Sequence, residues 1–172
     1  MTRELIIVRH AKSAWDTGAA SDFDRPLAKR GRKAAPRVGR YLRRQHLFPD
    51  YVVSSPAERA RQTVLGICEQ LDFNTDLINW DSRIYGGSTG SLVNVLRDCP
   101  DNAERVFIAG HNPGLEYLLL HLCDHDVPMP DDGKLLPTAA VAHLDISREW
   151  HGLGRGSGRL LSITRARSLT ED

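Results

Sequence analysis

The stretch that decides the fold is Leu5-Ile6-Ile7-Val8-Arg9-His10-Ala11-Lys12-Ser13. Its first four residues form a continuous apolar run, mostly β-branched, which is typical of a central strand covered on both faces. An arginine and a histidine follow this run directly. Open α/β sheets place their chemistry in the crevice beyond the carboxyl ends of their strands. The stretch therefore predicts an α/β fold with Arg9 and His10 at that edge of the sheet.

Two later segments repeat the pattern of an apolar run that ends in polar chemistry. The run at 50–54 leads into Ser54-Ser55-Pro56-Ala57-Glu58-Arg59, and the run at 105–109 leads into Gly110-His111-Asn112-Pro113. In the first of these, Ser55 is expected to cap a helix, with Pro56 and Glu58 in its first turn. Arg59 would then lie beside the strand end, where helix amides favour an anion. In the second, Asn112 is expected to cap the next helix.

The remaining segments predict a single-domain three-layer sandwich with a mostly parallel central sheet flanked by helices. Helical spacing follows each of the first three strands, and the spacing at 29–45 contains Pro36. Two final strands are expected near 139–146 and 159–164, after a long loop at 124–137. The order of strands and helices indicates mainly parallel connections. The domain is predicted to span 1–164, and 165–172 is predicted to be a frayed tail.

Composition narrows the class of protein. The chain has 172 residues, a formal net charge of +1 and 26% charged residues, which is typical of one soluble globular domain. No run is long enough for a signal peptide or a membrane span. Three cysteines in apolar surroundings indicate reduced, buried thiols. We therefore expect a cytoplasmic protein with neither a membrane nor a nucleic acid as its partner.

The residues at the three strand ends are those that phosphate chemistry requires. Phosphoryl transfer needs donors around three oxygens and an in-line nucleophile. Arg9 and Arg59 can supply planar bidentate donors, and His10 can attack if its other ring nitrogen donates to a backbone carbonyl. His111 can donate to the oxygens as charge builds. Ser13 either contacts the phosphate or ends a turn. No cofactor or metal is expected, because the fixed positive charge suffices.

These motifs, in this order, resemble those of the histidine phosphatase (phosphoglycerate mutase-like) superfamily. The segments are Arg9-His10-Ala11-Lys12-Ser13, Ser54 to Thr63, and Gly110-His111-Asn112-Pro113. The resemblance implies a phosphoglycerate mutase-like fold, with His10 as the phosphorylated nucleophile and Arg9, Arg59 and His111 as the phosphate pocket. The short chain and the Arg-His-Ala-Lys-Ser variant are most similar to SixA-type phosphohistidine phosphatases.

One departure from the mutases bears on the substrate. The mutases place a glutamate proton donor just before an Arg-x-Tyr-Gly sequence, whereas Ser82 stands there in Asp81-Ser82-Arg83-Ile84-Tyr85-Gly86. An alkoxide leaving group needs a general acid, an effect of about 10²–10⁴-fold, while an imidazole leaves more easily. The sequence therefore favours a phosphorylated protein, carrying phosphohistidine, over a small phosphate ester. Asp81 is the candidate proton donor if an ester is the substrate.

Other interpretations remain open. The chain could be a broad small-molecule phosphomonoesterase, or a non-catalytic module that only binds phosphate. The basic run at 29–44 is interpreted as the solvated face of an amphipathic helix, with docking of an acidic protein as the alternative and nucleic-acid binding as a distant third. His121, Cys123 and His125 are spaced too closely along a helix to share one metal.

Overall fold

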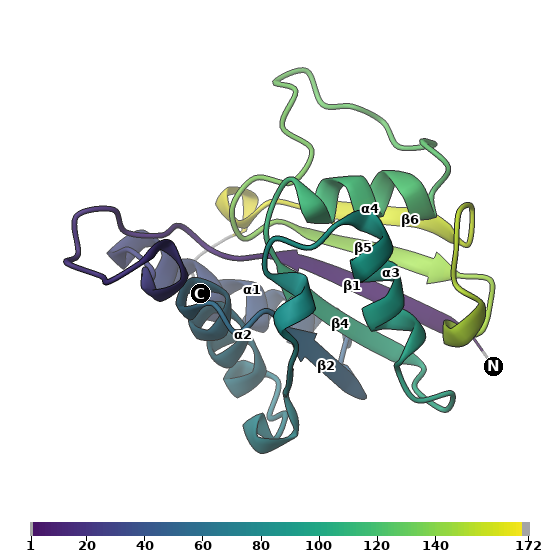
Figure 1. Ribbon diagram of the computed structural model, residues 1–172, viewed down its shortest axis with the longest axis horizontal. Helices are drawn as coiled ribbons and strands as arrows, with labels where there is room; N and C mark the ends of the chain where they lie inside the picture. Colours follow the sequence, from purple (N-terminus) through teal and green to yellow (C-terminus); the bar gives the residue numbers. More distant parts are fainter. Residues whose placement is uncertain (1, 170–172) are drawn as a thin grey trace.

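The computed structural model describes residues 2–169 and contains one six-stranded sheet (Figure 1). The strand order is β3-β2-β4-β1-β5-β6. The strands are β1 (Arg3–Arg9), β2 (Tyr51–Ser54), β3 (Asn79–Trp80), β4 (Arg105–Gly110), β5 (Val141–Ile146) and β6 (Gly158–Thr164). The first four run parallel, and β5 pairs antiparallel with both β1 and β6. The predicted mostly parallel sheet is confirmed, and β3 is an addition, too short to leave a periodic signal.

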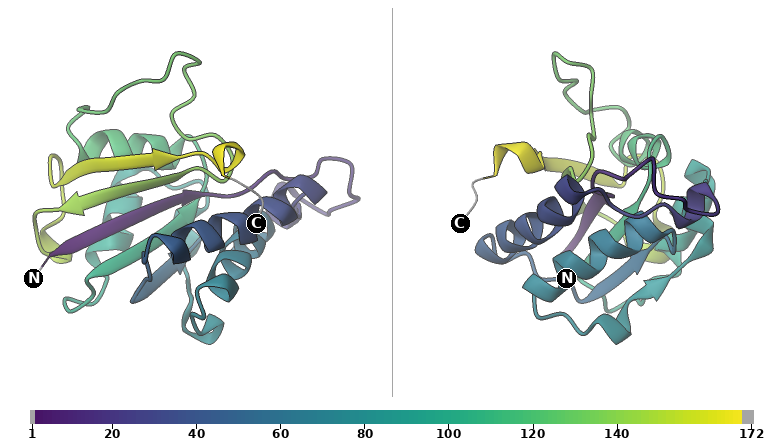
Figure 2. Two further views of the ribbon diagram at one scale, coloured as in Figure 1. Left: turned by 180° about the vertical axis from the view of Figure 1, so that it is seen from behind. Right: turned by 90° about the vertical axis from the view of Figure 1, so that its left-hand side faces the viewer.

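Two pairs of helices cover the sheet and complete the predicted sandwich (Figures 1 and 2). They are α1 (Lys29–Arg44) and α2 (Glu58–Gln70) on one face, and α3 (Thr89–Arg97) and α4 (Gly114–Leu122) on the other. Strand β1 contributes side chains to the hydrophobic core on each face of the sheet. Leu5 and Ile7 pack toward α3 and α4, while Ile6 and Val8 pack toward α1 and α2. The apolar run at 5–8 is continuous for this reason.

The first turn of α1 packs against the loop that follows β1. A Cβ atom on Gly31 would lie 2.2 Å from the carbonyl oxygen of Lys12, so only glycine allows this approach. Pro36 lies inside α1 rather than at its start. The described residues also contain five short 3₁₀ helices: η1 (Asp22–Asp24), η2 (Thr75–Leu77), η3 (Ser82–Ile84), η4 (Trp150–Gly152) and η5 (Ala166–Ser168).

Two predicted helix caps are wrong. Helix α2 begins at Glu58 with Ala57 in the cap position and no side-chain cap, and Ser55 Oγ instead accepts the Ala57 N–H at 3.2 Å. Helix α4 begins at Gly114 without a side-chain cap. The Asn112 amide donates at 2.8 Å to Glu116 and to the carbonyl of Leu136. Ser55 Oγ also contacts His111 and Asn112 reaches Leu136, and local sequence does not reveal either of these distant contacts.

The prediction of a frayed tail from Arg165 does not hold for residues 165–169. Ala166 is buried against the face of the sheet that α1 covers, and η5 follows Arg165. The Arg165 guanidinium donates to both carboxylate oxygens of Asp132, at 2.7 and 3.0 Å. Residues 170–172 lie outside the described residues. Within the described part of the chain, no helix has both the length and the apolar content to cross a bilayer.

Candidate active site

His10 lies directly after β1 and is fixed by its backbone. Its N–H donates to the carbonyl of Gly110 and its own carbonyl accepts from the Ala139 N–H, both at 3.0 Å. The residue is 7% exposed, and Nδ1 lies 2.7 Å from the carbonyl oxygen of Ala11. A carbonyl only accepts, so the proton of the neutral ring resides on Nδ1. Nε2 therefore carries a lone pair, as a nucleophile requires.

The surroundings of His10 keep its imidazole neutral. Burial lowers its pKa to about 4, and the positive charges of Arg59, Arg9 and Arg25 act in the same direction. The hydrogen bond to Ala11 opposes this shift in part. At pH 7 the ring is consequently unprotonated at Nε2.

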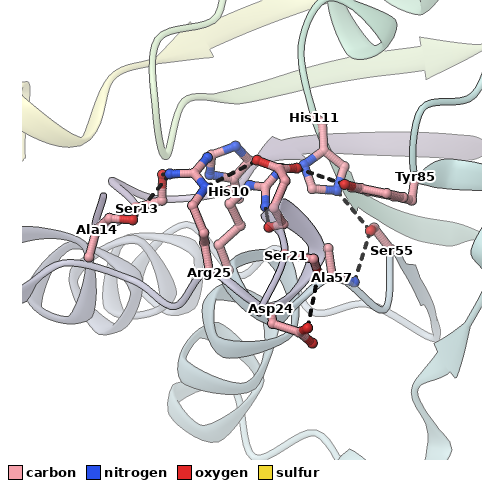
Figure 3. A network of polar contacts seen from close by, with 12 residues as sticks. His10, Ser13, Ala14, Ser21, Asp24, Arg25, Ser55, Ala57, Tyr85 and His111 are labelled. Atoms are coloured by element: carbon pink, nitrogen blue, oxygen red, sulfur yellow. Dashed lines mark hydrogen bonds and ion pairs between the residues drawn. The ribbon is translucent and has the colours of Figure 1, made fainter. Parts of the chain in front are cut away.

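His111 follows β4 and faces His10, with the two ring centroids 5.2 Å apart. Its Nε2 lies 2.8 Å from Ser55 Oγ (Figure 3). Its Nδ1 is buried and has no hydrogen-bond partner among residues 2–169. Burial lowers the His111 pKa to about 3, helped by His10 and Arg59. If Ser55 donates to Nε2, the remaining proton sits on Nδ1 and is available to a phosphate oxygen.

A half-buried and a buried arginine complete the predicted set. Arg59, in the first turn of α2, is 6% exposed, and Arg9 ends β1 with its Nη1 on the Leu136 carbonyl at 3.0 Å. Burial lowers the Arg9 pKa, although a guanidinium stays protonated in proteins. The Nε atoms of both arginines are buried without a partner in the described chain. Unpaired buried N–H groups are costly, and an oxyanion would satisfy them.

Sequence reasoning missed three residues at this site. The carboxylate of Asp22 accepts from the Tyr85 hydroxyl at 2.7 Å and from Arg59 at 3.0 Å, and it pairs with Arg25 at 3.1 Å. The Tyr85 hydrogen bond, then those from Arg59 and Arg25, hold the Asp22 pKa well below its usual range. Asp22 and Arg25 lie in a connection without periodicity, so no sequence signal marked them. The Asp22 carboxylate, an anion of the protein itself, thus accepts hydrogen bonds from side chains at the pocket.

Ser13 is linked to the pocket through Arg25. Its hydroxyl accepts a hydrogen bond from Arg25 Nη1 at 3.1 Å, and the same nitrogen donates to the Ala14 carbonyl (Figure 3). The Arg25 guanidinium also stacks 3.7 Å above the ring of Trp15. Ser13 therefore orients an arginine whose charge acts on His10.

Residues 5–90 match the model of the histidine phosphatase superfamily (branch 1). The chain belongs to this superfamily. Uncharacterized protein Rv1276c of Mycobacterium tuberculosis is 31% identical over 162 residues, which cover 91% of this chain and 98% of the relative. The phosphohistidine phosphatase SixA of Escherichia coli is 26% identical over 152 residues, covering 87% and 89%. The solved structure of SixA from Nakamurella multipartitia has a TM-score of 0.83 at 25% identity, covering 96% of each chain.

In this histidine phosphatase, Asp81 is paired with Arg83. Asp81 precedes η3, and its carboxylate accepts from the Arg83 N–H at 3.0 Å and from Arg83 Nη2 at 2.7 Å. The hydrogen bonds from Arg83 lower the Asp81 pKa. A carboxylate held ionised in this way donates no proton until the pair opens. Within residues 2–169, no group of three or more His, Cys, Asp and Glu side chains is arranged to hold a metal ion.

Proposed function

We propose that this histidine phosphatase hydrolyses phosphohistidine on a protein through a covalent intermediate at His10, without a metal ion. The observation that carries the proposal is the state of His10. Its proton is held on Nδ1 by the Ala11 carbonyl at 2.7 Å, and its lowered pKa leaves Nε2 unprotonated. Arg9, Arg59 and His111 supply donors around it.

The proposed reaction has two steps. In the first, His10 Nε2 attacks phosphorus, and the N–P bond of the substrate breaks as the N–P bond to His10 forms. The substrate imidazole, which already carries a proton on its other ring nitrogen, leaves with the electron pair as a neutral ring. In the second step water attacks phosphorus, the bond to His10 breaks, and inorganic phosphate leaves. Both arginines hold the equatorial oxygens, and His111 donates to them as charge develops.

The choice of a phosphoramidate over an ester rests on the leaving group. An alkoxide needs a positioned acid, and the Asp81 carboxylate is committed to Arg83. A protonated imidazole leaves without such help. The similarity to proteins named SixA phosphohistidine phosphatases supports the same choice. A small-molecule phosphomonoesterase is the alternative, and it requires Asp81 to leave Arg83. A module that only binds phosphate would have no need of a neutral His10.

The test is a comparison of turnover rates with EDTA present throughout. A phosphohistidine peptide, phosphoserine and sugar phosphates are offered to the wild type and to His10→Ala. We expect preferential turnover of the phosphohistidine peptide and none by His10→Ala, with far-UV circular dichroism showing that the variant folds. ³²P-labelled substrate should leave alkali-stable label on the wild type only. Retained activity in a folded His10→Ala would contradict the mechanism. Preference for an ester would contradict the assigned substrate, and a requirement for metal would contradict the metal-independent reaction.

A further inference from the structure

A second concave surface, which we name the basic groove, adjoins the phosphate pocket. It has a volume of about 610 Å³. Its cationic lining comes from four separate parts of the chain: Arg9 and Lys12, Arg30 and Arg37, Lys134, and Arg165 and Arg167. Figure 1 shows the loop between α4 and β5, which contributes Lys134, and Figure 2 shows η5 on the side of α1. The fold thus gathers distant basic residues at one place.

The basic groove and the phosphate pocket share a wall. Arg9 lines the groove, and its charge also acts on His10 and His111. Leu136 and Ala139 line the groove as well. The Leu136 carbonyl accepts from Arg9 at 3.0 Å, and the Ala139 N–H donates to the His10 carbonyl at 3.0 Å. A substrate whose phosphate is held near His10 therefore has its adjoining atoms within reach of the groove.

Part of the positive charge of the groove has no carboxylate partner among residues 2–169. Glu116 is the acidic residue in its described lining, and this carboxylate already accepts from Asn112 at 2.8 Å. Asp132, nearby, pairs with Arg165 at 2.7 Å and with Arg167 at 3.6 Å. Among residues 2–169, no carboxylate lies within ion-pair distance of the other basic side chains at the rim. These side chains, all exposed, are those of Lys12, Arg30 and Lys134.

We propose that the basic groove binds an acidic segment of the phosphoprotein substrate, with carboxylates that flank the phosphohistidine in sequence or in space. This inference rests on the proposed function and names the substrate surface that it requires. The cations are spread along a groove of about 610 Å³, and four of them sit on long, exposed side chains: Lys12, Arg30, Lys134 and Arg167. That arrangement suits several carboxylates on an extended partner, whereas one further phosphate would need a compact set of buried donors. Complementary charge of this kind favours one partner over others and speeds encounter.

The experiment uses two phosphohistidine peptides that differ only in flanking residues, Glu in one and Gln at the same positions in the other. The enzymes are the wild type, the triple variant Lys12→Gln/Arg30→Gln/Lys134→Gln, and a control. The control, Lys33→Gln/Arg44→Gln/Arg148→Gln, removes the same charge from exposed positions that do not line the groove. Each kcat/KM is measured at low salt and at about 0.5 M salt, where exposed ion pairs are screened.

We expect the wild type and the control to prefer the Glu peptide by about tenfold, the combined effect of a few exposed ion pairs. The triple variant should lose that preference and keep its kcat/KM on the Gln peptide, and high salt should erase the preference in the wild type. Equal rates on both peptides with the wild type would overturn the inference while leaving the proposed function intact. An equal loss by the control would overturn it as well. If neither peptide is hydrolysed while an ester is, the proposed function itself fails.

A small anion is the competing occupant, and the same variants distinguish it. A bisphosphorylated small molecule and its monophosphate are compared as substrates. If the wild type prefers the bisphosphate, the triple variant loses that preference, and the wild type treats both peptides alike, the groove binds a second phosphate and the inference is wrong. If the wild type treats the two small molecules alike and prefers the Glu peptide, and the triple variant loses that preference, an acidic protein segment is supported.

Discussion

The carboxylate of Asp22 lies 3.0 Å from Nη2 of Arg59, and the same guanidinium donates through Nη1 to the Asp22 main-chain carbonyl at 2.7 Å. The 3₁₀ turn η1 thus places both a charged and a neutral oxygen on the arginine that is proposed to hold phosphate. Tyr85 shares the carboxylate. A phosphate that uses these donors has to displace the Asp22 side chain, so Asp22 and the phosphate compete for Arg59.

Asp22→Asn should bind inorganic phosphate or vanadate more tightly than the wild type, by about three- to tenfold. The reason is that the variant removes a negative charge from the donors of Arg59 and removes its repulsion of the incoming anion. Asp24→Asn in the same turn is the matched control, because Asp24 accepts from Ser21 and does not reach Arg59. Isothermal titration calorimetry measures both. Weaker binding by Asp22→Asn would show that Asp22 mainly positions Arg59.

Arg59→Lys should lower kcat/KM by about 10²-fold or more despite keeping the charge. A lysine offers a point charge in place of two parallel N–H donors, and it cannot replace the Nε–H that is buried without a partner. Arg61→Lys, an exposed neighbour on α2 whose guanidinium lies over Trp80, should remain close to wild type. Steady-state kinetics decide the matter, and an active Arg59→Lys would remove the bidentate role.

Ser55→Ala should lower kcat more than it raises KM, because Ser55 positions His111 rather than holding the substrate. Its hydroxyl lies 2.8 Å from His111 Nε2, and its loss frees the ring to change tautomer. We expect a fall of about tenfold in kcat, in the range typical of a proton-donor effect that is weakened rather than removed. Ser54→Ala removes an equally buried hydroxyl whose one hydrogen bond among residues 2–169 goes to the Ser55 carbonyl. Equal losses in the two variants would indicate a general packing defect.

The parts of the fold that the sequence predicted are those that local residue patterns determine. The continuous apolar run at 5–8 identified β1 because residues on both faces of that strand are buried. The same logic located β2 and β4, and the polar residues after each of the three strands meet because parallel strands end at one edge. His10, His111, Arg9 and Arg59 are therefore brought together from three segments that are far apart in the chain.

The parts that escaped prediction depend on contacts between distant residues. Asp22 and Arg25 lie in an irregular connection, and only the folded chain sets them beside Arg59 and Tyr85. Ser55 has the composition of a helix cap, yet its hydroxyl contacts His111, 56 positions away. Residues 165–169 make distant contacts through the buried Ala166 and the ion pair between Arg165 and Asp132. In each case a tertiary partner decides between local alternatives that the sequence leaves equal.

Asp81→Asn tests whether a proton donor exists for esters. Because the Asp81 carboxylate is paired with Arg83, we expect turnover of a phosphohistidine peptide to change by less than about threefold, the size of an ordinary surface perturbation. A larger loss confined to phosphoserine or a sugar phosphate would identify Asp81 as an acid that leaves Arg83 during ester hydrolysis. The ratio of the two kcat/KM values is the measurement. Equal, large losses on both substrates would contradict the view that an imidazole needs no such acid.

The stability of the protein should fall as the pH is lowered from about 6.5 to about 4. The pKa of His10 is lowered to about 4 and that of His111 to about 3, whereas an unfolded histidine titrates near 6.5. In this interval the unfolded chain binds more protons than the native one, so the free energy of unfolding decreases with falling pH. Each histidine contributes a slope of at most about 1.4 kcal/mol per pH unit.

Urea unfolding at pH 7, 6 and 5 measures this slope, and the difference between variants isolates it from the titration of carboxylates. His10→Asn should unfold with a shallower dependence on pH than the wild type, because it removes one buried group that must stay neutral in the native state. His46→Asn controls for the loss of an imidazole as such, since His46 is exposed and asparagine tolerates its positive φ of 57°. A slope unchanged by His10→Asn would mean that His10 titrates alike in both states. The unprotonated Nε2 would then need a cause other than burial.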